Sequence, residues 1–133
     1  MNKKIQPFFI FQTLYKEKEM ELLIMNITKK GENEILVVSL EGKLDTTTAS
    51  QLQNVLSKAF EDITQNTENS MTKEVHLDCE KLSYVSSAGL RVLLIMEKMS
   101  KSSGIPFILN GISDDIMEVF NMTGFDKMLT IKN

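Results

Sequence analysis

The stretch Leu82–Leu94, with the sequence LSYVSSAGLRVLL, leads from a predicted strand into a predicted helix. Apolar residues alternate with polar ones over 75–79, which is typical of a half-buried strand. The apolar spacing over 88–101 predicts a helix. Either Ser86 or Ser87 is expected to cap it, because a serine hydroxyl accepts a hydrogen bond from a free N–H of the first turn. A strand that runs into a helix in this way is the building unit of a parallel sheet.

The same alternation of strands and helices continues on both sides of this stretch. Polar residues at 29–33, which include a glycine, predict a hairpin turn. Helix starts are indicated by the capping-box spacing of Thr48 and Gln51, and by Ser113 followed by two aspartates. The expected strands span 22–28, 35–40, 75–79, 106–109 and 128–131, and the expected helices span 48–63, 88–101 and 113–123. The order β-β-α-β-α-β-α-β predicts a single α/β domain with a mixed sheet of four to five strands.

Composition narrows the classes of function. The chain has 133 residues, the size of one domain, and its formal net charge is −3. Direct binding of nucleic acid is not expected, because it requires a basic surface. Cys79 and His76 are the only residues of their kinds, so neither an intrachain disulfide, a cysteine–histidine metal cluster nor a cofactor is expected. No stretch approaches the roughly 20 apolar residues of a membrane-spanning helix. This composition fits a cytoplasmic protein.

The beginning of the chain is predicted to lie outside the domain, which is expected to occupy residues 21–133. Residues 1–20 form an extension that is disordered, or that precedes a true start at Met20 or Met25, or that makes a helical arm. The aromatic residues through which such an arm would dock or dimerise are Phe8, Phe9, Phe11 and Tyr15. Export is not expected, because the apolar run is interrupted and no small-residue cleavage site follows it. The polar loop at 64–73 has no assigned role.

A helical wheel of residues 88–101 separates two faces. One set of residues falls within about 100°, the width of a stripe that faces a core; it consists of Val92, Ile95, Met96 and Met99. A second face near the helix start has the spacing i, i+3, i+4 and i+7; it consists of Ser87, Leu90, Arg91 and Leu94. Leucines beside a serine outside the core stripe indicate a docking surface for a partner. The alternative is that another segment of the chain covers them.

An enzymatic site is not expected. A serine–histidine–aspartate set could be drawn only from Ser87, His76 and Asp45, whose spacing does not support it. The G-x-S-x-G elbow of serine hydrolases is missing, as are the glycine-rich motifs that bind nucleotides. His76 is expected to be a partly buried strand residue, and Cys79 a small apolar one.

Four landmarks occur in order along residues 22–133. They are Leu40–Asp45 (LEGKLD), Leu77–Asp78, Val85–Arg91 (VSSAGLR) and Asn121–Phe125 (NMTGF). Together with the strands and helices expected between them, these landmarks resemble the STAS domain of bacterial anti-sigma factor antagonists. The resemblance implies a protein-binding regulatory module rather than an enzyme.

The resemblance also implies a partner switch. An unphosphorylated antagonist of this family binds an anti-sigma factor, a serine kinase of the GHKL type, and thereby frees a sigma factor. The kinase phosphorylates the antagonist at the start of the second helix, and a PP2C-type phosphatase reverses the modification. The phosphoacceptor position of the family falls on Ser87. Many family members have aspartate where this chain has Ser86, which makes that serine an alternative acceptor.

The partner-binding residues that the resemblance implies are Asp45, Ser86, Ala88, Gly89, Leu90, Arg91 and Leu94. Asp45 is expected to lie close to Ser87 and to contribute to recognition, or else to cap the turn before the first helix. Free N–H groups at a helix start favour a phosphate, whereas a partner packed on Leu90 and Leu94 would have to bury its charge. The alternative function is a STAS scaffold, or a subunit of a signalling or lipid-transport complex, that binds without phosphorylation.

Overall fold

The computed structural model describes residues 8–14, 23–31, 34–65 and 72–133. Its elements are β1 (Phe8–Leu14), β2 (Leu23–Lys30), β3 (Ile35–Leu44), α1 (Thr46–Gln65), β4 (Glu74–Val85), α2 (Ser87–Ser103), β5 (Phe107–Asn110), α3 (Asp114–Thr123), a 3-10 turn (Phe125–Lys127) and β6 (Ile131–Lys132). Tyr15, the possible start at Met20 and most of the loop at 64–73 lie outside the described residues.

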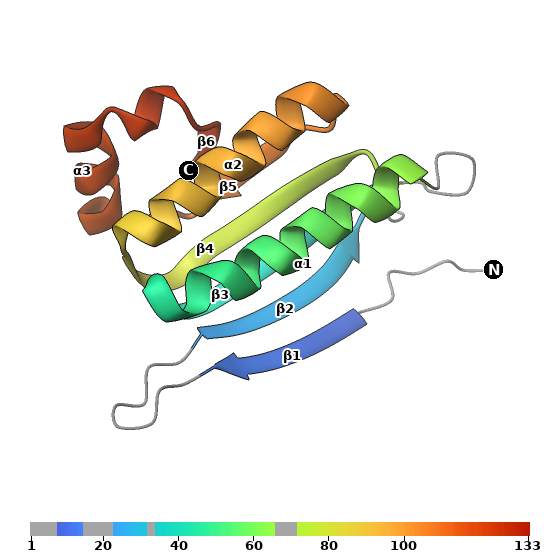
Figure 1. Cartoon of the computed structure of the whole chain (residues 1–133), viewed down its shortest axis with the longest axis horizontal. Helices are drawn as coiled ribbons and strands as arrows, with labels where there is room; N and C mark the ends of the chain where they lie inside the picture. The colour runs from blue at the N-terminus through green and yellow to red at the C-terminus, as the bar shows by residue number, and fades with distance from the viewer. Residues whose placement is uncertain (1–7, 15–22, 32–33, 66–71) are drawn as a thin grey trace.

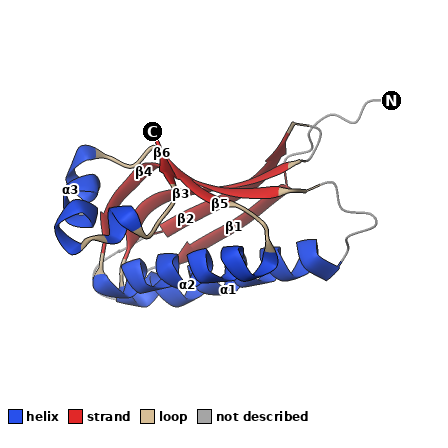
Figure 2. Cartoon of the chain, turned by 90° about the horizontal axis from the view of Figure 1, so that it is seen from above, coloured by secondary structure: helices blue, strands red, loops and turns tan. Residues whose placement is uncertain are grey.

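A sheet of six strands, in the order β1-β2-β3-β4-β5-β6, forms the centre of the fold (Figure 1). β1, β2 and β3 are antiparallel neighbours, whereas β3, β4, β5 and β6 run parallel to one another. α1 and α2 lie side by side on one face of this sheet (Figure 2). From β2 onward the structure confirms the predicted α/β class and the order β-β-α-β-α-β-α-β.

The N-terminal segment supplies one strand more than the sequence predicted. The expectation of a helical arm is wrong for residues 8–14, which form β1 and pair with β2 from Phe8↔Ile27 to Leu14↔Leu23. Aromatic and β-branched residues favour extended chain, and a helix of so few residues is marginal in water. Pairing with β2 gives the same residues hydrogen-bond partners, so the strand prevails.

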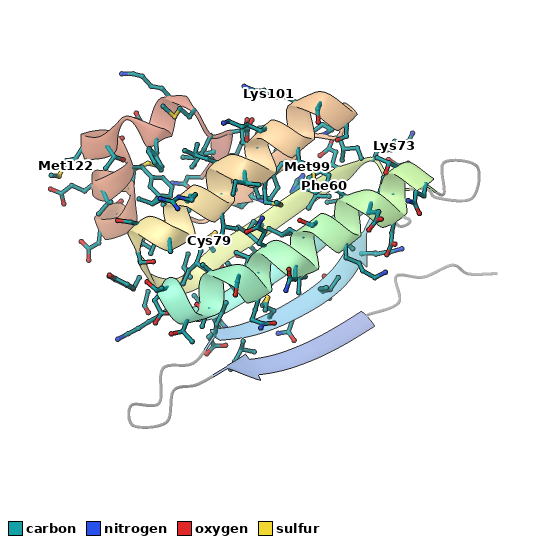
Figure 3. All side chains as sticks on the ribbon, in the orientation of Figure 1. Phe60, Lys73, Cys79, Met99, Lys101 and Met122 are labelled. Atoms are coloured by element: carbon teal, nitrogen blue, oxygen red, sulfur yellow. The ribbon has the colours of Figure 1, made fainter. Side chains whose placement is uncertain are left out.

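The core lies between the sheet and its two long helices. Leu36, Val38 and Leu40 alternate along β3 and are buried against the helices, as the twofold period of a strand requires. Phe60 of α1 meets Phe107 of β5 edge to face, with ring centroids 6.0 Å apart. This pair joins the helical layer to the parallel part of the sheet, and Phe60 is labelled between the α1 and α2 ribbons in Figure 3.

The first helix begins earlier than its sequence pattern predicted. Thr48 and Gln51 do not form the capping box, because Asp45 is the residue that caps α1. The N–H of Thr48 donates to Oδ1 of Asp45 at 3.0 Å, and the N–H of Asp45 donates to Oγ1 of Thr48 at 2.9 Å. The same reciprocal arrangement therefore exists three residues nearer the N-terminus.

The other helix ends agree with their sequence signals. The N–H of Ile116 donates to the Ser113 hydroxyl at 3.2 Å, so Ser113 caps α3 as predicted. α2 and α3 end at Gly104 and Gly124, whose φ angles of 78° and 82° favour glycine. The last strand is shorter than expected, because the N–H groups of Met128 and Leu129 donate to the Phe125 carbonyl and so continue the 3-10 turn.

Candidate functional site

The candidate site lies where β3 and β4 end side by side. β4 is longer than predicted and continues to Val85, which pairs with Leu44 of β3. The backbone N–H of Ser86 then donates to the Leu44 carbonyl at 2.8 Å. Asp45 directly follows Leu44, and Ser87 directly follows Ser86, so the two residues lie at the same end of the sheet. We call this region, formed by Asp45 and the first turn of α2 from Ser86 to Leu90, the α2 corner.

Gly89 lets the first turn of α2 lie directly on the end of β3. A Cβ atom at this position would lie 2.8 Å from Cγ of Leu44 and 2.9 Å from its carbonyl oxygen. That oxygen is backbone and already accepts the Ser86 N–H, so it cannot move away without breaking the corner. A glycine in the first turn of a helix is the sequence signal for this contact, whereas Leu44 carried no signal of its own.

The two serines at the start of α2 have different roles. Ser86 is the N-cap: its hydroxyl accepts the Gly89 N–H at 3.1 Å, and its carbonyl accepts the Leu90 N–H at 2.9 Å. Ser87 is the first helical residue and is exposed. The serine that caps the helix is therefore not the serine that is exposed.

The start of α2 is electrostatically suited to an added negative charge. Its first turn contains no acidic residue. The unpaired N–H groups of a helix start carry a partial positive charge that favours an anion. Arg91 follows Ser87 by four residues, which places it one turn along the same side of the helix, and it is exposed.

Leu90 corrects the prediction of an apolar docking surface. It is only 6% exposed and belongs to the core cluster that also contains Ile116 and Phe120 of α3. The same flank of α2 carries Glu97, whose Oε2 accepts the Thr130 hydroxyl at 3.4 Å. The C-terminal part of the chain therefore covers this flank, which is the alternative that the helical wheel left open.

The structure agrees only in part with the predictions for Leu94 and for the core stripe of α2. Leu94 is half-buried and packs partly against the core. Val92 and Met96 are buried as expected, whereas Ile95 and Met99 are half-buried. The buried face of α2 is thus rotated from the predicted stripe, since it also includes Leu90, Leu93 and Glu97.

Asp45 has a defined structural role at the same corner. Its Oδ1 accepts the N–H groups of Thr47 and Thr48 at 2.9 Å and 3.0 Å. This is the capping role that the sequence analysis gave as one of two alternatives. Asp45 is half-buried, so part of its surface remains accessible beside Ser86 and Ser87.

The serine–histidine–aspartate set is not assembled. His76 lies near the beginning of β4, whereas Ser87 follows its other end. Both ring nitrogens of His76 have other neighbours: Nε2 lies 2.8 Å from Oε1 of Glu74, and Nδ1 lies 3.2 Å from Nδ2 of Asn110. His76 therefore lies with Glu74 and Asn110 on the face of the sheet that α1 and α2 do not cover.

Cys79 is a buried apolar residue of the core. It is fully buried, and Figure 3 labels it at the middle of the molecule. Burial, and to a lesser degree the negative charge of Asp78, raises the pKa of its thiol to about 12. The thiol therefore stays protonated at neutral pH and is not a nucleophile.

The described residues contain no group of three or more histidine, cysteine, aspartate or glutamate side chains that could hold a metal ion. Within the same residues, no helix has the length and apolar character needed to cross a membrane.

The sequence of the chain matches the model of a known family. The family model of the STAS domain matches residues 26–133. The chain belongs to the STAS domain family.

Its relatives carry regulatory names. It is 28% identical over 109 residues to BtrV of Bordetella bronchiseptica, provisionally named an anti-sigma factor antagonist, covering 82% of this chain and 87% of BtrV. It is 24% identical over 107 residues to an anti-sigma-B factor antagonist of Staphylococcus aureus, covering 80% of this chain and 92% of that protein. The Bacillus cell fate determinant SpoIIAA in its phosphorylated form has the same fold, with a TM-score of 0.59 and 19% identity over 82% of this chain and 91% of that one.

Proposed function

We propose that this chain is an anti-sigma factor antagonist that binds an anti-sigma factor at the N-terminal corner of α2 and is released by phosphorylation of Ser87. One observation carries the proposal: Ser87 is exposed at the first position of a helix whose cap is already supplied by Ser86. The names of the curated relatives support the same role. SpoIIAA, a protein with this fold, exists in a phosphorylated form.

The modification needs no catalytic group from this chain. The γ-phosphoryl group of ATP is transferred to Oγ of Ser87; the bond to ADP breaks, and the hydroxyl proton passes to a base of the kinase. The anti-sigma factor is itself the kinase, of the GHKL type, and supplies the nucleotide, the metal ion and the base. A PP2C-type phosphatase hydrolyses the phosphoserine and restores the binding form.

Ser87 is a better acceptor than Ser86. The Ser86 hydroxyl is half-buried and accepts the Gly89 N–H, so its phosphorylation would disrupt the N-cap. Losing a serine cap costs about 1 kcal/mol of stability. Phosphorylation of Ser87 leaves that hydrogen bond in place and adds a charge where the helix favours one.

Phosphorylation changes binding more than stability. A phosphoserine carries about −1.5 to −2 charges at neutral pH. Within this chain the charge lies at a solvent-exposed helix start, which tolerates it. A partner that covers the corner must remove the same charge from water, which costs several kcal/mol unless the charge is paired.

The structure divides the predicted contact residues into two groups. Residues with accessible surface at the corner are proposed to touch the partner directly: Asp45, Ser86, Ser87, Ala88, Arg91 and Leu94. Gly89 and Leu90 are buried, and they act by fixing the position of the helix on the sheet. We place this activity in the cytoplasm, because a released sigma factor acts on RNA polymerase there.

Affinity capture from a lysate of the native organism tests the proposal. The baits are the unmodified chain, Ser87→Ala, Ser87→Asp and Ser113→Asp. Ser113→Asp is the matched control, because it adds the same charge at the start of α3 rather than α2. The proposal expects a GHKL-type kinase on every bait except Ser87→Asp.

Two outcomes would contradict the proposal. If all four baits hold the same protein and it is not a kinase, the chain is a scaffold that binds without phosphorylation. If Ser113→Asp loses the kinase together with Ser87→Asp, general charge rather than the α2 corner controls binding.

A further inference from the structure

Among the described residues, the outer edge of β1 has no strand paired with it. β1 is the first strand in the order β1-β2-β3-β4-β5-β6, and it pairs with β2 along one side (Figures 1 and 2). No strand in the described part of the chain pairs with its other side. A strand in this position presents backbone N–H and C=O groups that another strand can bind.

β1 has few of the features that keep edge strands from associating. Such strands are blocked by charged side chains, proline, very short length or a bulge. The seven residues of β1, FFIFQTL, contain no charged residue and no proline. A register irregularity between Phe8 and Gln12 is the one blocking feature that β1 has. The opposite edge of the sheet, β6, has only two residues, one of which is Lys132.

We infer that β1 pairs antiparallel with β1 of a second copy of this chain, joining two six-stranded sheets into one. Two identical strands that pair antiparallel are related by a twofold axis, so the contact closes as a dimer. Because β1 is uncharged, the two copies meet there without like-charge repulsion. Pairing of β1 with β6 of another copy would form an open chain of copies, but β6 offers only two residues to it.

The dimer leaves the candidate site of each copy open. The α2 corner follows β4, and β2 and β3 separate β4 from β1 in the sheet. A second copy at β1 therefore extends the sheet away from Ser87. The inference concerns a different edge of the molecule and does not depend on the proposed function.

Sedimentation velocity of the full chain over a concentration series tests the dimer. Phe11 is the middle residue of β1, so a strand pair that is symmetric about its centre places the two Phe11 residues opposite each other. Phe11→Lys and Phe11→Glu each place like charges together there and should weaken dimerisation by roughly tenfold or more. Asn121→Lys, an exposed change on α3, is the control that should leave the dimer unchanged.

An equimolar mixture of Phe11→Lys and Phe11→Glu separates loss of pairing from loss of folding. Opposite charges then meet across the twofold axis, so the mixture should regain the dimer that each variant alone has lost. A wild-type chain that stays monomeric, or that forms assemblies larger than a dimer, would overturn the inference. So would dimers that persist in both Phe11 variants, and so would a mixture that stays monomeric.

Discussion

α2 and α3 begin with the same backbone arrangement. Ser86 caps α2 and Ser113 caps α3, and each hydroxyl accepts the N–H three residues further on, at 3.1 Å and 3.2 Å. Both caps have extended backbone. Differences between the two helix starts therefore arise from the side chains that follow each cap.

Those side chains differ first in charge. Asp114 and Asp115 follow the cap of α3, whereas Ser87 and Ala88 follow the cap of α2. An exposed carboxylate near a helix start stabilises it by about 0.3–1 kcal/mol. α3 carries its anions permanently, whereas α2 would acquire one only through the proposed phosphorylation of Ser87.

The two starts differ also in how they are anchored. The third and fourth helical positions of α2 are Gly89 and Leu90, and both are buried. The same positions of α3 are Ile116, which is buried, and Met117, which is half-buried. The start of α2 is therefore anchored by buried residues at its third and fourth positions, while its first turn carries no acidic residue.

The largest expected effect concerns the anchoring. Leu90→Ala should lower the free energy of unfolding by about 2–5 kcal/mol, because a buried leucine leaves a cavity. Met117→Ala, at the matched position of α3, should cost less, since that side chain is half-buried. Urea unfolding of both variants measures the difference. If both variants lose the same small free energy of unfolding, Leu90 does not anchor the start of α2.

The next effect concerns the glycine contact. Gly89→Ala should destabilise the chain by about 1–3 kcal/mol, because the new methyl group meets the Leu44 backbone. Helix propensity alone predicts the opposite sign, since alanine is favoured over glycine by about 1 kcal/mol. Urea unfolding decides between the two signs, and Ala88→Gly, which changes propensity without this contact, is the control. If Gly89→Ala stabilises the chain, a methyl group at position 89 fits beside Leu44 without a clash.

A smaller effect compares the caps directly. Ser86→Ala and Ser113→Ala should each cost about 1 kcal/mol, because both remove a side-chain acceptor from a helix start. Ser87→Ala should change stability by less than about 0.5 kcal/mol, as exposed substitutions usually do. Thermal unfolding of the three variants measures this. If Ser87→Ala costs as much as Ser86→Ala, the division of roles between the two serines is wrong.

The smallest effect concerns charge. Ser87→Asp should raise the free energy of unfolding by about 0.3–1 kcal/mol, and Asp114→Asn should lower it by a similar amount. Both changes should shrink in high salt, which screens exposed charges. Melting curves at low and high ionic strength provide the measurement. If the Ser87→Asp variant is less stable than the unmodified chain at low salt, the start of α2 does not favour a negative charge.

The sequence predicted what depends on local pattern and missed what depends on tertiary contacts. Ser113, Gly104 and Gly124 mark helix ends through their own backbone preferences, and the structure confirms each of them. Leu90 was misjudged because a helical wheel considers a single helix and does not include the C-terminal segment that covers this flank.

Two other errors have the same physical origin. Asp45 is a common cap residue, but Thr48 is not the Glu or Gln that the capping-box pattern looks for, so the pattern favoured Thr48 and Gln51. The end of β3 at Leu44 places the cap at Asp45 instead. β1 is a strand because β2 lies beside it, and no local pattern in an aromatic run reveals a neighbour. For the candidate site, the resemblance supplied the serine at position 87, while the contact between Gly89 and Leu44 required coordinates.

We expect a phosphate on Ser87 to weaken binding of the proposed partner strongly and to leave the fold intact. Calorimetric titration of the anti-sigma kinase with unmodified chain and with chain carrying phosphoserine at position 87, alongside a thermal melt of each, tests it directly. The account predicts binding weaker by about 100-fold or more, since several kcal/mol separate the two states, with no fall in the melting temperature of the modified chain. Equal affinity of both forms, or loss of binding only where the modified chain unfolds, would contradict it.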